Sequence, residues 1–321
     1  YIHAEVRGAF MKGEWVVTTK ENYRIPFTAQ AGQAFRFTSL TEAPVGDLSG
    51  EWAALFDIAS DEPYKAIGEF KQQQNRLTGT FRTETGDYRY LEGTVQGRKF
   101  WLSCFDGTHA FLFSGSMRGD SLQGEFRSGK SAGELWTAWR DPNFRLGAAD
   151  SLVTLKAGVA GITFRDTTPE GRILAFPGPD YAGKVKIFTI LGTWCPNCRD
   201  EQLFLSEYLR RHPEQAAQMA VVGFAFERHK TAAEANAHLS AYKQKLGIPF
   251  DIVHAGKNNK DVAAAYFPSL SRVMAFPTMI VLDKRNQVRR IHTGFDGPAT
   301  SKYAEFEQEF GRLIGALIEE K

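Results

Sequence analysis

The residue pattern of this 321-residue chain changes near residue 145, and that change constrains the fold more than any other feature. Before it, short runs rich in Val, Phe, Tyr, Trp and Thr are broken by Gly, Asp and Asn, and five of the six tryptophans occur there. Such runs are typical of antiparallel strands joined by turns. They predict strands at 14–19, 52–58, 64–70, 88–95, 99–105, 110–113 and 134–139. We therefore expect residues 1–145 to form an all-β antiparallel barrel or sandwich of about eight to ten strands.

A different pattern follows Asp141-Pro142-Asn143 and a short linker. The nearly continuous apolar run at 185–191 is typical of a strand buried on both faces of a sheet. Further strands are predicted at 219–226, 250–254, 278–282 and 288–292, and helices at 196–211, 232–246, 261–266 and 299–318. Because strands and helices alternate, residues 152–321 are expected to form an α/β domain with a mainly parallel sheet covered by helices on both faces.

Composition excludes several classes of protein. Lys and Arg number 39 against 37 Asp and Glu, so no basic surface for nucleic acid is expected. No run reaches the roughly 18 apolar residues of a membrane span. Three cysteines are too few for a disulfide-stapled scaffold. Since the chain starts at Tyr1 without a charged-then-apolar leader, we expect a mature or trimmed product.

Two of the cysteines form a Cys195-Pro196-Asn197-Cys198 motif between a predicted buried strand and a predicted helix. Cys195 falls at the helix start, where free N–H groups and the helix dipole stabilise a thiolate. Cys198 lies one turn further on the same side, where it can attack a mixed disulfide at Cys195. Pro196 suits the first helical turn, in which its missing N–H is not needed. The motif therefore favours a redox-active disulfide that carries out two-electron thiol–disulfide exchange.

The residues around these two cysteines disfavour several other functions. A structural zinc site needs two more ligands, and the sequence has no second CxxC and no HxxxH. Haem attachment needs a histidine after the second cysteine, where Arg199 stands. A peroxiredoxin-like site needs Pro seven and Thr three residues before Cys195, and these positions hold Phe188 and Gly192. A structural disulfide and a thiol peroxidase remain as alternatives.

With this motif, residues 152–321 resemble the TlpA/ResA group of exported thioredoxin-like thiol–disulfide oxidoreductases. The Trp194-to-Cys198 motif carries the resemblance, and Ala275-Phe276-Pro277-Thr278 matches the family's cis-proline loop. The 79 positions from Cys198 to Pro277 leave room for an extra helix–strand excursion at about 231–254, which resembles the family's central insert. The resemblance implies a thioredoxin-like fold with that insert. Residues 1–145 resemble no family that we assign.

The resemblance also implies how a substrate docks. A cis bond before Pro277 exposes the backbone of Phe276 beside the dithiol, where an incoming chain can pair with it as a strand. We expect Trp194, Pro196, Phe276 and Pro277 to form the substrate-binding surface, which we call the docking rim.

Glu227 is a further catalytic candidate, since it ends the strand expected to neighbour the dithiol strand. ResA-like members have a glutamate at the matching place. A half-buried carboxylate there can take the proton from Cys198 and raise thiol pKa values by like-charge repulsion. The alternative is a solvated charge beside Arg228 and His229.

Together these features predict a two-domain exported oxidoreductase that reduces protein disulfides. Cys195 attacks and Cys198 resolves, no organic cofactor or metal is needed, and an unidentified donor resupplies electrons to the protein. The family resemblance implies a bacterial periplasm. The alternative is a scaffold in which the β domain binds partners and the thioredoxin-like module is redox-inert. Cys104, the third cysteine, is expected to be a small core residue.

Overall fold

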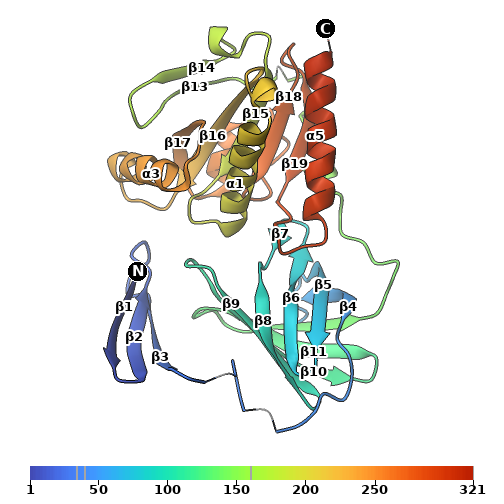
Figure 1. Ribbon diagram of the computed structural model, residues 1–321. Helices are drawn as coiled ribbons and strands as arrows, with labels where there is room; N and C mark the ends of the chain where they lie inside the picture. The colour runs from blue at the N-terminus through green and yellow to red at the C-terminus, as the bar shows by residue number, and fades with distance from the viewer. Residues whose placement is uncertain (34, 40, 160, 321) are drawn as a thin grey trace. The chain divides into compact units, whose positions relative to one another are not determined.

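The computed structural model describes residues 1–33, 35–39, 41–159 and 161–320 (Figure 1). The chain divides into two compact units. The first comprises Tyr1–Thr83 and Tyr88–Leu146, and the second comprises Glu84–Asp87 and Gly147–Lys321. Glu84–Asp87 includes the short strand β7 (Gly86–Asp87).

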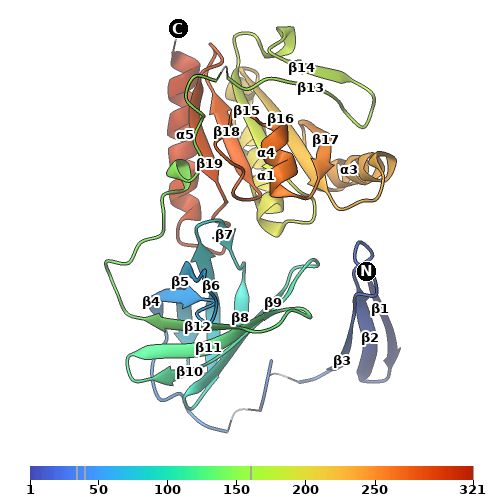
Figure 2. The same ribbon diagram turned by 180° about the vertical axis from the view of Figure 1, so that it is seen from behind.

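Within the described part of the first unit, eight antiparallel strands close into a barrel (Figure 2). They are β4 (Gly50–Phe56), β5 (Tyr64–Gln73), β6 (Arg76–Thr83), β8 (Leu91–Gln96), β9 (Lys99–Phe105), β10 (Ala110–Arg118), β11 (Ser121–Ser128) and β12 (Glu134–Trp139). Each strand pairs with the next along the chain, and β12 pairs with β4 to close the sheet. The predicted all-β class is confirmed, and of the two predicted forms it is the barrel.

Aromatic side chains fill the barrel because alternate residues of each strand point inward. Phe56, Phe81, Phe100 and Phe113 are fully buried and belong to one hydrophobic cluster. Cys104 was expected in this core, but it is only partly buried and packs against the cluster. It is the next-to-last residue of β9, and Phe105 after it is exposed.

A separate three-stranded antiparallel sheet precedes the barrel: β1 (Ile2–Arg7), β2 (Phe10–Val16) and β3 (Arg24–Gln30). The sequence predicted only one strand here, at 14–19. Nearly all residues of β1 and β3 are exposed, so neither strand has the buried face that produces a clear alternating pattern.

The second unit is built on a five-stranded sheet in the order β17-β16-β15-β18-β19. Its strands are β15 (Val185–Leu191), β16 (Met219–Glu227), β17 (Asp251–Lys257), β18 (Thr278–Leu282) and β19 (Val288–Thr293). The first three are mutually parallel, β18 runs antiparallel to β15, and β19 pairs antiparallel with β18 to form a hairpin. Every residue of β15 is buried, as its apolar run predicted.

Helices cover both faces of this sheet. They are α1 (Pro196–Arg211), α2 (Pro213–Ala216), α3 (Ala232–Leu246), α4 (Lys260–Tyr266) and α5 (Tyr303–Glu319), with short 3-10 turns at Ala149–Ser151 and Pro179–Tyr181. Helices α1 and α5 pack on one face, and α4 packs on the other with a hairpin of β13 (Phe164–Thr167) and β14 (Ile173–Phe176) (Figures 1 and 2). The predicted α/β class is therefore confirmed.

Helix α1 buries Phe204, Leu205 and Tyr208, whereas Leu203 is 37% exposed. The last helix differs from the sequence prediction, because α5 begins at Tyr303 rather than at 299. Within the described ranges, no helix is both long and apolar enough to cross a membrane.

Candidate active site

The two cysteines of the motif lie at the first turn of α1, directly beyond the carboxyl end of β15. Cys195 is the N-cap of the helix, and the backbone N–H of Cys198 donates to its Sγ at 3.3 Å. Both residues are free thiols; Cys195 is 7% exposed and Cys198 is fully buried. The helix N-terminus therefore delivers an N–H group to one sulfur, as a thiolate requires.

Cys198 is the less acidic candidate for attack on a substrate. Burial raises the pKa of Cys198 well above its usual value, and the hydrogen bond and charge of Cys195 raise it further. Because a thiol must ionise before it attacks, this environment favours Cys195 as the first nucleophile.

The loop around Pro277 lies beside Cys195. The Phe276–Pro277 bond is cis, as the sequence predicted, and the Cys195 thiol donates to the Phe276 carbonyl at 3.3 Å. The Trp194 ring meets Phe276 edge-on, with ring centroids 5.4 Å apart. Of the docking rim, Trp194, Pro196 and Phe276 are half-buried, whereas Pro277 is buried and offers little surface.

Glu227 is the last residue of β16 and is only 1% exposed. Its carboxylate accepts two hydrogen bonds from Thr193, one from the backbone N–H and one from the hydroxyl, both at 2.8 Å. Burial raises the pKa of Glu227, opposed by these bonds and by the charges of His229 and Arg228. The alternative of a solvated charge is therefore wrong. Its hydrogen bonds reach the turn before Cys195 rather than a sulfur atom.

Sequence reasoning did not select Glu201, which lies one helical turn after Cys198. Its side chain is fully buried, and its Oε2 accepts hydrogen bonds from the Thr189 hydroxyl and, at 3.2 Å, from Gln202. Burial raises the pKa of Glu201 to about 8, opposed by the Thr189 bond. The charge of Glu201 also contributes to the raised pKa of Cys198. The sequence contained a signal, since position 201 shares the buried helix face of Cys198 and Leu205.

Arg228 was likewise not selected as a site residue. Its guanidinium lies over the Trp194 ring, 4.3 Å from the ring centroid. Burial lowers the pKa of Arg228, and the negative charges of Glu227 and of the Cys195 thiolate oppose that effect. Arg228 therefore brings a positive charge within electrostatic reach of the attacking sulfur. Nothing in the linear sequence reveals this stacking.

We expect Arg228→Met to slow alkylation of reduced Cys195 by iodoacetamide about fivefold at pH 7, because it removes an attractive charge from the thiolate. Methionine keeps an unbranched stem over Trp194, and Arg228→Lys is the matched control that keeps the charge. The rate is followed by mass spectrometry at several pH values. Equal rates in wild type and Arg228→Met would show that the guanidinium does not support the thiolate.

Asn197, between the two cysteines, is held by the Glu84–Asp87 segment of the same unit. With its amide oriented to satisfy both groups, Asn197 donates to the Asp87 carbonyl at 3.2 Å and accepts from the Asp87 N–H at 2.9 Å. The Asp87 carboxylate in turn accepts from the Gly297 N–H at 3.0 Å. Both polar groups of the Asn197 side chain are therefore used in hydrogen bonds to the Asp87 backbone.

The second unit is similar to known proteins. Residues 176–307 match the family model Redoxin. The thiol-disulfide oxidoreductase ResA of Geobacillus thermodenitrificans is 26% identical over 115 residues, which are 36% of this chain and 58% of that protein. The thioredoxin-like protein YneN of Bacillus subtilis is 27% identical over 115 residues, 36% of this chain and 59% of that protein. The matches thus span less than two thirds of these relatives.

Solved structures similar to this chain include two bacterial proteins. One is a thiol:disulfide interchange protein of the thioredoxin family from Chlorobium tepidum, with TM-score 0.37, 18% identity, and coverage of 49% of this chain and 94% of that one. The other is a secreted thiol-disulfide isomerase from Corynebacterium glutamicum, with TM-score 0.39, 14% identity, and coverage of 56% and 99%.

Proposed function

We propose that this chain, whose residues 176–307 are a Redoxin domain with a thioredoxin-like fold, is a thiol–disulfide oxidoreductase that reduces protein disulfides. One observation carries the proposal. The Cys195 sulfur caps helix α1 and accepts a hydrogen bond from the Cys198 N–H, while the Cys198 side chain is fully buried one turn further along the helix. This arrangement separates an attacking thiol from a resolving thiol.

The proposed reaction has two exchange steps. The Cys195 thiolate attacks one sulfur of a substrate disulfide, so a Cys195–substrate disulfide forms and the other substrate sulfur leaves as a thiolate. Cys198 then loses its proton and attacks the Cys195 sulfur, which releases the second substrate thiol and leaves a Cys195–Cys198 disulfide. Two electrons pass from the protein to the substrate.

The second step needs a base, because burial keeps Cys198 protonated. Two buried carboxyl groups flank the dithiol. Glu201 lies one turn from Cys198 and interacts electrostatically with it, but a pKa of about 8 leaves Glu201 largely protonated at neutral pH. Glu227 is hydrogen-bonded to Thr193 in the turn before Cys195. We therefore assign the proton of Cys198 to Glu227.

Substrate docking is proposed at the docking rim. The half-buried rings of Trp194 and Phe276 give an apolar surface beside Cys195, and the Phe276 backbone lies within hydrogen-bonding reach of that sulfur. A substrate segment pairing with Phe276 as a strand brings its disulfide to Cys195. Pro277 acts through the shape of this loop rather than through contact.

The proposed partners follow from the same chemistry. Electrons are stored in the dithiol, so the reaction needs no organic cofactor or metal. Substrates are disulfide- or thiol-containing proteins, and a separate donor must reduce the Cys195–Cys198 disulfide after each turnover. We place the activity outside the cytoplasm, in a bacterial periplasm, because stable substrate disulfides accumulate in oxidising compartments.

The test is the reduction potential of the Cys195–Cys198 pair, titrated in a thiol buffer and followed by Trp194 fluorescence. Trp194→Phe identifies the part of the signal that comes from this residue. We expect a value near or below about −270 mV, as for a reductase. A value of about −120 to −180 mV would make the protein an oxidant or isomerase instead. Absence of a reversible two-electron transition would overturn the proposal and favour a redox-inert scaffold.

A further inference from the structure

A row of hydrogen-bonded side chains connects Glu227 with the surface helix α3. The Thr193 hydroxyl donates to Glu227 Oε2 at 2.8 Å, and His238 Nε2 lies 3.0 Å from the same Thr193 oxygen. A hydroxyl has one proton to donate. While that proton points at the carboxylate, His238 must donate its own Nε2 proton to the Thr193 oxygen.

The two ends of this row have opposite surroundings. Glu227 is only 1% exposed, whereas His238 is exposed on α3. Thr193 stands between them in the turn that leads to the dithiol. Each residue in the row carries a group that can both give and take a proton. The row therefore joins a buried acid to solvent.

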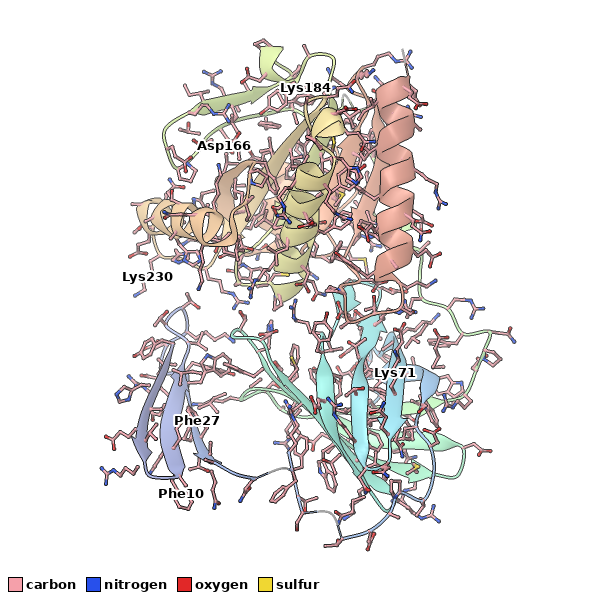
Figure 3. All side chains as sticks on the ribbon, viewed as in Figure 1. Phe10, Phe27, Lys71, Asp166, Lys184 and Lys230 are labelled. Carbon is pink, nitrogen blue, oxygen red and sulfur yellow. The ribbon has the colours of Figure 1, made fainter. Side chains whose placement is uncertain are left out.

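A second imidazole lies against this row. The His229 ring centroid is 4.7 Å from that of His238, and His229 Nδ1 is 3.7 Å from Glu227 Oε2. That nitrogen is buried and has no hydrogen-bond partner. His229 lies in the loop from β16 to α3, next to Lys230, which is labelled in Figure 3. His229 therefore lies beside Glu227 Oε2 directly, whereas His238 is connected with that oxygen through Thr193.

Other charged and titratable groups face this cluster from the neighbouring elements. Arg228 interacts electrostatically with Glu227, and His254 of β17 interacts with Lys257 and His229. Tyr242 of α3 interacts with Glu227 and with the two cysteines of the motif. Lys257 donates to the carbonyl of His229 and, at 3.1 Å, to that of Lys230, so it holds the loop in place.

The pKa values of Glu227 and His238, the two ends of the row, are shifted toward each other. Burial raises the pKa of Glu227, and burial together with the charge of His229 lowers the pKa of His238. Proton transfer is easiest between groups of similar pKa, so neither end holds the proton too firmly to pass it on.

We propose that Thr193 and His238 form a proton relay through which Glu227 exchanges protons with solvent during each oxidation of the dithiol. This rests on the proposed function, in which Glu227 accepts the proton released by Cys198. Thr193 and His238 are positioning residues, because they act on the sulfur atoms only through the carboxyl group.

The relay moves protons without moving electrons. His238 is exposed, so exchange with water can move its single ring proton from Nε2 to Nδ1 and leave Nε2 free to accept. A protonated Glu227 then donates from Oε2 to the Thr193 oxygen as the Thr193 hydroxyl proton passes to Nε2 of this neutral His238. The resulting imidazolium releases its Nδ1 proton to water and keeps the Nε2 proton, which it again donates to Thr193. The carboxylate is then ready to accept the next proton, and one proton has left Glu227 for each proton that reaches solvent.

The experiment follows oxidation of the fully reduced, full-length protein by oxidised glutathione in stopped flow at pH 7 and low buffer concentration. We expect His238→Gln to slow the step that forms the Cys195–Cys198 disulfide about tenfold, because glutamine donates a hydrogen bond but cannot carry a proton. Added imidazole should restore the rate by supplying the missing base. His212→Gln, at an exposed histidine after the far end of α1, is the matched control and should behave as wild type.

Thr193 supplies the second arm. Thr193→Ser keeps the hydroxyl and should retain the wild-type rate, whereas Thr193→Val should be slow and should not respond to imidazole. A wild-type rate in His238→Gln would overturn the relay, and so would slow oxidation that imidazole leaves unchanged. If wild-type protein itself formed no Cys195–Cys198 disulfide, the proposed function would fail instead, so the two failures are distinguishable.

Discussion

Cys198→Ser is expected to accumulate a covalent complex with its substrate through Cys195, and Cys195→Ser is expected to lose disulfide exchange by more than about 1000-fold. Serine cannot attack the mixed disulfide, so the intermediate persists when the resolving sulfur is removed. Cys195→Ser lacks the sulfur that caps α1 and forms no such complex. Non-reducing electrophoresis and intact mass spectrometry show the complex, and dithiothreitol must release it.

Cys104→Ser is the control for this pair, because Cys104 lies in β9 of the barrel unit and has no role in the proposed exchange. It should retain both activity and a wild-type reduction potential. Complex formation by the Cys195→Ser,Cys198→Ser double variant would show that a different nucleophile is at work. Unchanged partner binding by Cys195→Ser, together with no disulfide exchange by the wild type, would support the scaffold alternative.

The helices and buried strands of the second unit were well predicted because local signals mark their ends. The ranges 196–211 and 232–246 match α1 and α3. Pro196 fits the first turn of α1, Thr231 caps α3 through a capping box with Glu234, and Gly247 ends α3 with a φ of 62°. These features act within a few residues of sequence, so they are visible without the fold.

The strands that were missed lack such signals. In β13, Phe164 is the only apolar residue, and β14 is an apolar run of only four residues, Ile173–Phe176. Phe164 and Phe176 are buried against the sheet. Their places depend on contacts with β15 and β16, which only the folded chain provides.

In the candidate site too, the residues in local motifs were predicted from the sequence, and those that depend on contacts between separate elements were not. Cys195, Cys198 and the loop at Pro277 were found from motifs. The surroundings of Glu227 depend on the pairing of β15 with β16, which brings the end of one strand beside the turn after the other. The arrangement of Arg228 over Trp194 and of His238 against Thr193 depends on contacts between separate elements. A single sequence gives no measure of such contacts.

Glu201→Gln is expected to stabilise the reduced protein at alkaline pH. Burial raises the pKa of Glu201 to about 8 in the folded state, from an ordinary 4.5. The folded protein therefore binds this proton more tightly than the unfolded chain, and that stabilisation is complete below pH 4.5 and lost as pH rises through 8. Glutamine carries no such proton, so the variant escapes the loss. The advantage in unfolding free energy above pH 8 should be on the order of 5 kcal/mol.

Urea unfolding of reduced wild type and Glu201→Gln at pH 4.5 and 9 measures this difference. Glu227 titrates in both proteins and therefore cancels from the comparison. Glu214→Gln, at an exposed position in α2, is the matched control and should follow wild type at both pH values. The glutamine oxygen can still accept the hydrogen bond from Thr189. A general loss of packing in the variant would lower the free energy of unfolding at both pH values, whereas the titration effect appears only as the pH rises. Parallel stability curves for wild type and Glu201→Gln would mean that the folded protein holds Glu201 ionised at little cost, and Glu201 would then be available as a base for Cys198 at neutral pH.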